Sequence, residues 1–119
     1  HAHEWLVNAV QIETAEGVNQ VDAIAAVDGA DVIFAGPLDL TTNLGIMGQY
    51  SHPIFLDALK RIAAAAKNAG KAAGILLLDP AQLTMAHELG YSFIALGSDG
   101  GSVNAALRAT ATAVKAAKK

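Results

Sequence analysis

Cysteine is absent from the 119-residue sequence, which excludes disulfide bonds and thiolate metal sites and agrees with a reducing compartment. Charged residues are also scarce, at 16%, and the net charge of -3 provides no basic field that would recruit nucleic acid or an anionic membrane. No apolar run approaches the roughly 20 residues that a membrane helix needs, and no basic-then-apolar leader opens the chain. We expect a soluble cytoplasmic protein without nucleic-acid or membrane partners.

Several catalytic signatures are missing as well. The sequence contains no P-loop, no dinucleotide-binding glycine fingerprint, no HExxH helix and no serine nucleophile elbow, so common nucleotide and hydrolase chemistries lose support. What it does contain is apolar material, because hydrophobic residues make up 53% of the chain. That share is enough to bury a core of ordinary density, and the sequence therefore predicts a globular protein.

Short apolar segments alternate with helical patterns along the chain. Runs of β-branched and aliphatic residues predict buried strands at residues 6–13, 31–35, 72–78 and 93–96. Helical spacing predicts helices at residues 18–27, 53–68, 80–89 and 102–119, with one or two further turns at residues 38–44. Four βα units imply parallel strands, because each crossover is long enough to hold a helix. The pattern alone leaves two architectures open, an open doubly wound sheet and half of a closed barrel, with residues 1–119 forming one partial domain in the second case.

Acidic residues stand where the predicted strands end, which is where functional groups collect in parallel α/β folds. Glu13 ends the first strand, and Asp39 follows the second strand behind a tight turn. Two carboxylates at neighbouring strand ends suit a hard divalent cation that keeps positions open for water and substrate. The alternative is that such residues only cap the next helix, and capping is the favoured role for Asp79 because Pro80 follows it.

Two segments resemble the metal-binding motifs of a known enzyme family. Residues 10–14 (VQIET) and residues 34–40 (FAGPLDL) are similar to the motifs of the HpcH/HpaI aldolase family, which includes 2,4-dihydroxyhept-2-ene-1,7-dioate aldolase and macrophomate synthase. The resemblance covers nearly the whole chain. It implies the carboxyl-terminal half of a TIM (β/α)8 barrel, with four βα units and parallel strands. It also implies a class II aldolase that binds Mg2+ or Mn2+, or alternatively Co2+ or Zn2+, through Glu13 and Asp39.

The resemblance further implies a substrate site next to the metal. The implied substrate-binding residues, which lie at or near predicted strand ends, are Gln11, Gly36, Pro37, Leu38, Asp39 and Leu76. The backbone amides of Leu38 and Asp39 would hold the carboxylate of a pyruvate-type 2-oxo acid. Gln11 would support the site, and Leu76 would face the pocket for the aldehyde. The implied reaction is reversible cleavage of a 4-hydroxy-2-oxo acid into pyruvate and an aldehyde.

One part of the family's machinery has no counterpart in this sequence. By the resemblance, an arginine that stabilises the enolate and a histidine–aspartate pair for proton transfer belong to the amino-terminal half of the barrel. We therefore assign no catalytic acid or base here, and we expect a fragment or a chain that is completed by a partner. A noncatalytic half-barrel module that needs a partner segment is the alternative function, and an enzyme similar to citrate lyase or malyl-CoA lyase is a weaker one.

The last predicted helix bears on assembly. Members of the family pair their barrels through an exchanged last helix, so the resemblance implies that residues 103–119 pack on a neighbouring subunit of a homo-oligomer. The expected partners are therefore pyruvate, an aldehyde and further copies of the chain.

Overall fold

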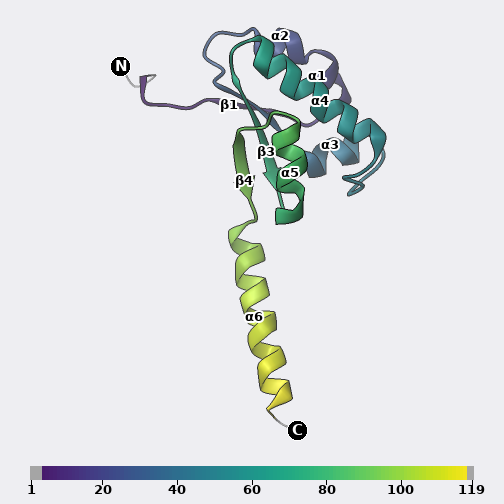
Figure 1. The fold of residues 1–119 in the computed structure, drawn as a ribbon, viewed down its shortest axis with the longest axis vertical. Coiled ribbons are helices and arrows are strands. Elements are labelled where there is room, and N and C mark those ends of the chain that lie inside the picture. Colours follow the sequence, from purple (N-terminus) through teal and green to yellow (C-terminus); the bar gives the residue numbers. More distant parts are fainter. Residues whose placement is uncertain (1–3, 118–119) are drawn as a thin grey trace.

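Four parallel strands form one sheet in the computed structural model, which describes residues 4–117. They lie in chain order as β1 (Ala9–Ile12), β2 (Val32–Ala35), β3 (Ala72–Leu77) and β4 (Phe93–Leu96), as Figure 1 shows. All three neighbouring pairs are parallel, so the predicted strand direction is confirmed. The prediction of strand at residues 6–13 was too long, because pairing with β2 begins only at Ala9 and ends at Ile12.

Helices fill the connections between the strands. They are α1 (Ala15–Asn19), α2 (Val21–Ala25), α3 (Pro37–Asn43), α4 (Pro53–Asn68), the 3-10 turn η2 (Pro80–Gln82), α5 (Leu83–Glu88) and α6 (Asp99–Ala116). The bounds predicted for α4 are confirmed, since Pro53 occupies its first position and the side chain of His52 caps it. The single helix predicted at residues 18–27 is wrong. Thr14 caps an earlier start, and the chain turns at Gln20, which separates α1 from α2.

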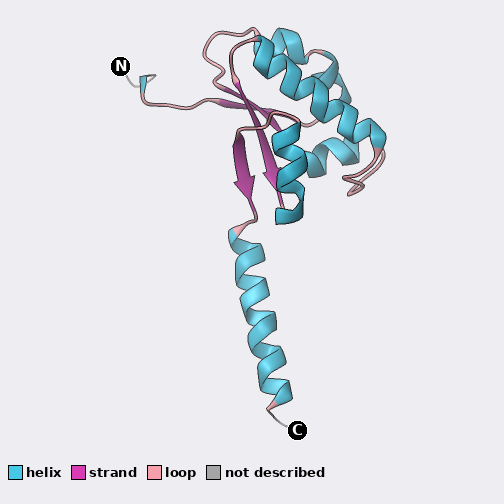
Figure 2. Cartoon of the chain, in the orientation of Figure 1, coloured by secondary structure: helices cyan, strands magenta, loops and turns pink. Residues whose placement is uncertain are grey.

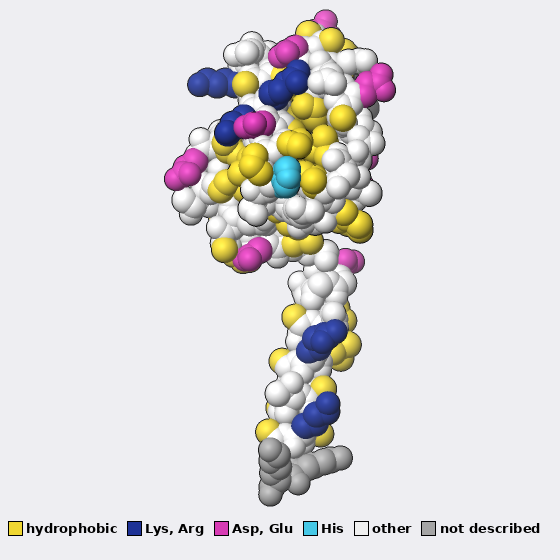
Figure 3. Space-filling view, turned by 90° about the vertical axis from the view of Figure 1, so that its right-hand side faces the viewer, with side chains coloured by type: hydrophobic (Ala, Val, Ile, Leu, Met, Phe, Trp, Pro, Cys, Tyr) yellow, Lys and Arg dark blue, Asp and Glu magenta, His cyan; other side chains and the backbone are white. Residues whose placement is uncertain are grey.

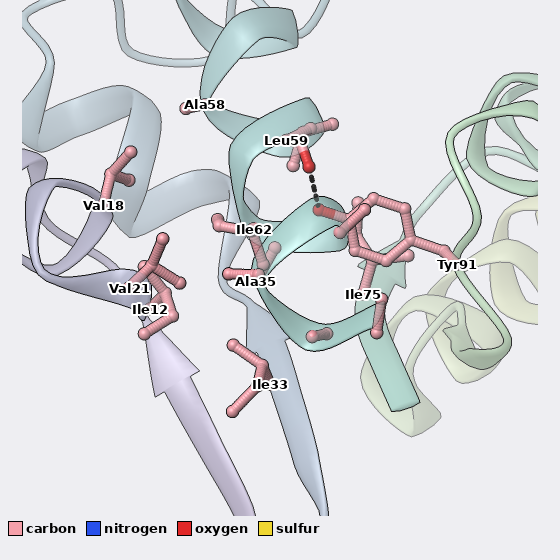
Figure 4. Close-up of a cluster of buried hydrophobic side chains, with 14 of the residues drawn as sticks. Ile12, Val18, Val21, Ile33, Ala35, Ala58, Leu59, Ile62, Ile75 and Tyr91 are labelled. Carbon is pink, nitrogen blue, oxygen red and sulfur yellow. Dashed lines mark hydrogen bonds between the residues drawn. The ribbon is translucent and has the colours of Figure 1, made fainter. Parts of the chain in front are cut away.

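One face of the sheet is buried under the helices, as the ribbon in Figure 2 indicates. Helix α4 packs against β2 and β3, and its Leu59 and Ile62 meet Ile33 and Ile75 of those strands in the core drawn in Figure 4. Tyr91 closes this core and donates a hydrogen bond from its hydroxyl to the Leu59 carbonyl oxygen (2.9 Å). Burial raises the pKa of the Tyr91 hydroxyl above its ordinary value of 10.0.

The opposite face of the sheet carries a row of residues that pair across the four strands. Gln11 pairs with Phe34, Phe34 with Gly74, and Gly74 with Phe93. The rings of Phe34 and Phe93 meet edge to face with their centroids 6.2 Å apart. A methyl group on Gly74 would lie 2.5 Å from Phe34 Cδ2, so glycine is needed there to make room for the ring. Phe93 and Gln11 at the two ends of the row are exposed.

Helix α6 extends away from the sheet and its covering helices, as Figure 1 shows. All of its residues are exposed, and the Cα radius of gyration reaches 17.5 Å. A compact domain of this length would have a radius of gyration of about 13–14 Å. The helix begins at Asp99, three residues earlier than predicted, because the Ser98 side chain accepts a hydrogen bond from Gly101 N (3.0 Å). Residues 118 and 119 of the predicted helix lie outside the described part of the chain.

None of the helices within residues 4–117 is long and apolar enough to cross a membrane.

Candidate functional site

The first predicted motif brings a glutamine and a glutamate together at the end of β1. Gln11 lies in β1 and Glu13 follows the strand, and Gln11 Nε2 donates a hydrogen bond to Glu13 Oε1 (2.6 Å). Gly36, the first residue after β2, lies alongside both side chains. A methyl group added to Gly36 would be 2.8 Å from Gln11 Nε2 and 2.9 Å from Glu13 Oε1. The carboxylate of Glu13 therefore sits against the backbone from which the second motif starts.

The second predicted motif forms the first turn of α3. Gly36 is the residue before the helix, and Pro37 takes the first helical position, where a missing N–H group has no consequence. The N–H groups of Leu38 and Asp39 follow, and first-turn N–H groups have no carbonyl partner within their own helix. Both residues are exposed. The turn thus places the first-turn N–H groups of two exposed residues beside a carboxylate side chain, an arrangement that can bind an anion and a cation side by side.

Two hydrogen bonds hold the motifs against each other. Gly36 N donates to the Ile12 carbonyl oxygen (3.1 Å), which continues the pairing of β1 and β2 past the end of the sheet. From the far end of α3, Asn43 Oδ1 accepts from Ala15 N (2.8 Å), two residues after Glu13. The turn that carries Glu13 is therefore bonded to both ends of α3.

A largely apolar pocket adjoins this turn. Its space is about 400 Å³ when the open mouth is included. The lining residues come from α3, the loop before α4, α4, the end of β3 and the η2–α5 segment: Pro37, Leu38, Tyr50, Phe55, Ile75, Leu76, Leu77, Leu78, Gln82 and Met85. The half-buried Leu76, predicted to face the aldehyde, is among them. Because Pro37 and Leu38 belong to both the pocket and the turn, a ligand held by the turn would reach the pocket.

The other acidic strand ends have local roles. Asp79 caps η2 by accepting a hydrogen bond from Ala81 N (2.9 Å), which confirms the predicted capping. Asp99 Oδ1 accepts from Gly100 N (2.7 Å) in the first turn of α6. Across residues 4–117 no group of three or more His, Cys, Asp or Glu residues is arranged to hold a metal ion. A cation site here would thus use the two carboxylates of Glu13 and Asp39, with the remaining positions left to water and substrate.

Sequence reasoning missed the polar residues that hold the site together. Asn43 and Thr41 lie within α3 and carry no motif or metal-ligand spacing. Thr41 is fully buried, and Asn43 joins two segments that are 28 residues apart in the sequence. A buried threonine one helical turn after a proline is a weak local signal, because its hydroxyl can bond to the carbonyl four residues earlier. No such signal exists for Asn43, whose partner depends on how the strands pair.

Known proteins share both sequence and fold with this chain. The sequence profile described as HpcH/HpaI aldolase/citrate lyase matches residues 3–106. A hydroxypyruvate/pyruvate aldolase of Paraburkholderia phytofirmans is 41% identical over 114 residues, which are 96% of this chain and 43% of that protein. A 5-keto-4-deoxy-D-glucarate aldolase of Citrobacter koseri is 45% identical over 106 residues, which are 89% of this chain and 41% of that protein.

The fold comparison gives the same result. The crystal structure of an HpcH/HpaI aldolase/citrate lyase family protein from Burkholderia cenocepacia is similar with a TM-score of 0.82 and 38% identity, over 96% of this chain and 43% of that one. The chain spans less than half the length of these relatives, and its four βα units form half of a TIM barrel, as predicted. With a profile match over most of its length and this shared architecture, the chain belongs to the HpcH/HpaI aldolase/citrate lyase family.

Proposed function

We propose that this chain carries the metal and carboxylate site of a class II aldolase, which reversibly cleaves 4-hydroxy-2-oxo acids into pyruvate and an aldehyde. The observation that carries the proposal is the contact of Gln11 and Glu13 with Gly36, on the turn that leads to Asp39. The names of two relatives, a hydroxypyruvate/pyruvate aldolase and a 5-keto-4-deoxy-D-glucarate aldolase, support the same class of chemistry.

Glu13 and Asp39 would hold the cation, most suitably Mg2+ or Mn2+. Both residues offer carboxylate oxygens, which hard divalent cations prefer. Gln11 engages Glu13 Oε1, which orients the carboxylate and leaves Oε2 for the cation. When bound, such an ion polarises the carbonyl oxygen of a 2-oxo acid and neutralises the negative charge that develops there.

The first turn of α3 would hold the carboxylate of the 2-oxo acid. The backbone N–H groups of Leu38 and Asp39 point outward from a helix start, where the helix dipole favours an anion. Gly36 adds no side chain to the turn, and Pro37 at the first helical position adds no N–H group. The aldehyde portion would then extend toward Leu76 and the apolar pocket beyond it.

The replacement Glu13→Gln tests the metal site. The assay uses the longest form of the protein that its gene encodes. In it, Mn2+-dependent exchange of pyruvate methyl protons with D2O should fall by at least about 100-fold. Loss of an outer-shell partner alone typically lowers metal affinity or activity by 10- to 100-fold, and Glu13 would be a direct ligand. The exchange is followed by proton NMR. Glu16→Gln is the matched control, since Glu16 is an exposed carboxylate on α1 that bonds to Gln20. Equal exchange by Glu13→Gln and the wild type would refute the assignment.

A noncatalytic half-barrel module is the second candidate function. The sheet favours it in one respect, because within residues 4–117 the outer edges of β1 and β4 have no neighbouring strand. Unpaired strand edges, together with the sheet face that carries Phe34 and Phe93, could be covered by a partner segment. Pyruvate release from a 4-hydroxy-2-oxo acid by the 119-residue chain alone, with Mn2+, would exclude this candidate. If only a longer polypeptide is active, the enzymatic function belongs to that polypeptide, and this chain is its structural and metal-binding half.

We also propose that the protein forms a homo-oligomer through α6. Val103, Leu107 and Val114 share one side of the helix and are 53–65% exposed. Figure 3 shows hydrophobic side chains along the projecting helix. On the sheet, Leu96 is 50% exposed although its strand neighbour Leu77 is buried. A second subunit that receives α6 would bury the apolar side of the helix and agrees with the exchanged helix that the family resemblance implies.

A further inference from the structure

Thr41 is a buried polar residue in the middle of α3, with 0% of its surface exposed. Its hydroxyl donates toward two carbonyl oxygens of the first helical turn, those of Pro37 (2.8 Å) and Leu38 (3.0 Å). A threonine hydroxyl inside a helix can satisfy itself with the carbonyl four residues earlier, so these bonds alone would be unremarkable. The same hydroxyl, however, also accepts a hydrogen bond from Gly48 N (3.1 Å), which lies seven residues away in the following loop.

The loop that follows α3 is therefore bonded twice to one residue. Besides the bond from Gly48 N to the hydroxyl, Ile46 N donates to the Thr41 carbonyl oxygen (2.9 Å). Two glycines with positive φ, Gly45 (73°) and Gly48 (74°), let the loop fold back onto the helix. Residues 44–51, named here the α3–α4 loop, are thus fixed by the helix that carries Asp39.

The α3–α4 loop also forms one wall of the apolar pocket. Tyr50 lines the pocket opposite the ring of Phe55, with the ring centroids 5.9 Å apart and edge to face. Pro37 and Leu38, whose carbonyls accept from Thr41, line the same pocket. The Thr41 hydroxyl consequently bonds both to the turn proposed to hold the metal and the carboxylate and to the loop that forms the pocket wall.

We propose that Thr41 is a positioning residue of this site: its hydroxyl fastens the α3–α4 loop to the first turn of α3 and so fixes the pocket wall at Tyr50 and the backbone around Asp39 together. The inference rests on the proposed metal site. Loss of the hydroxyl leaves Gly48 N without its partner and removes the link between the loop and the first turn of α3, so the loop is held less firmly and the orientation of Asp39 is less fixed.

The test compares Thr41→Val, which keeps the shape of the side chain but removes the hydroxyl, with Thr41→Ser, which retains the hydroxyl. Thr42→Val is the matched control. Thr42 is the next residue of the same helix and also donates to the Leu38 carbonyl oxygen (2.8 Å), but it is exposed and no bond to the loop is formed by its hydroxyl in the described chain. The readouts are hydrogen exchange at the Gly48 amide, Mn2+ binding followed by electron paramagnetic resonance, and the melting temperature, in the longest form that the gene encodes.

We expect Thr41→Val to raise the exchange rate at Gly48, because this amide loses its acceptor. The dissociation constant for Mn2+ should rise by about tenfold, the lower bound for lost outer-shell support. Thr41→Ser should restore both, and Thr42→Val should change neither. Should Thr41→Val lower only the melting temperature and leave Mn2+ affinity within twofold of the wild type, Thr41 is structural and the inference fails while the proposed function stands. If the wild type binds no Mn2+ at all, the proposed metal site fails, and the positioning role fails with it.

Discussion

The replacement Gly36→Ala probes the point where the two motifs meet. Gly36 has φ −98° and ψ 90°, a conformation that alanine can adopt, so the backbone itself does not oppose the change. The new methyl group, however, would lie 2.8 Å from Gln11 Nε2 and 2.9 Å from both Cγ and Oε1 of Glu13. The substitution therefore acts on the orientation of two side chains and on little else.

The size of the effect follows from these distances. Ordinary contact begins at 3.4 Å, so the two side chains must retreat by roughly 0.5 Å or rotate away. Forcing a side chain off its preferred rotamer costs about 0.5–1.5 kcal/mol. If this cost falls on the bound geometry of Glu13, Mn2+ affinity should decrease by about 2- to 12-fold, since 1.4 kcal/mol corresponds to a factor of ten. The fold should lose about 1 kcal/mol or less, because Gln11 lies on the surface and can relocate.

Mn2+ titration and thermal unfolding measure the two quantities separately. Gly100→Ala is the control for Mn2+ affinity, since a methyl group on this helical glycine would meet nothing within 4 Å. Its stability should rise by up to about 1 kcal/mol, because alanine is the better helix former. Wild-type Mn2+ affinity in Gly36→Ala would refute the reasoning, because it would mean that the position of the Glu13 carboxylate against Gly36 has no bearing on the cation.

Three further predictions concern the core, the open face and α6. Tyr91→Phe removes the bond to the Leu59 carbonyl (2.9 Å) and should cost about 1–3 kcal/mol in urea unfolding. Because burial raises the Tyr91 pKa above 10.0, wild-type stability should be complete below about pH 10 and should fall as the pH rises further, a slope that the variant should lack. Gly74→Ala places a methyl group 2.5 Å from Phe34 Cδ2 and 2.7 Å from Val32 Cγ1 and should cost about 1–3 kcal/mol in thermal melts, of which a second change, Phe34→Ala, should recover only a part because Val32 remains. Leu107→Asp should reduce the mass in light scattering, and an unchanged mass would contradict assembly through α6.

Much of the fold was predictable because the relevant signals are local. Helix α4 has its predicted bounds, since a proline at its first position and an apolar stripe depend only on residues within a few turns. The capping role of Asp79 was predicted for the same reason. The split of α1 from α2 was not, because Thr14 and Gln20 act through hydrogen bonds that the apolar spacing does not reveal.

The sequence by itself determined the alternation of strand and helix, the parallel direction of the strands and, through two short motifs, the family. Only the tertiary structure decided which side chains meet. The contact of Gln11 and Glu13 with Gly36 depends on the register of β1 against β2, and the role of Thr41 depends on how a loop folds back. The apolar stripe of α6 indicates that the helix is buried against something but not against what, and packing on a neighbouring subunit was expected only through the family resemblance. Contacts between distant segments are set by packing of the whole chain, whereas motifs and periodicity report only on neighbours in sequence.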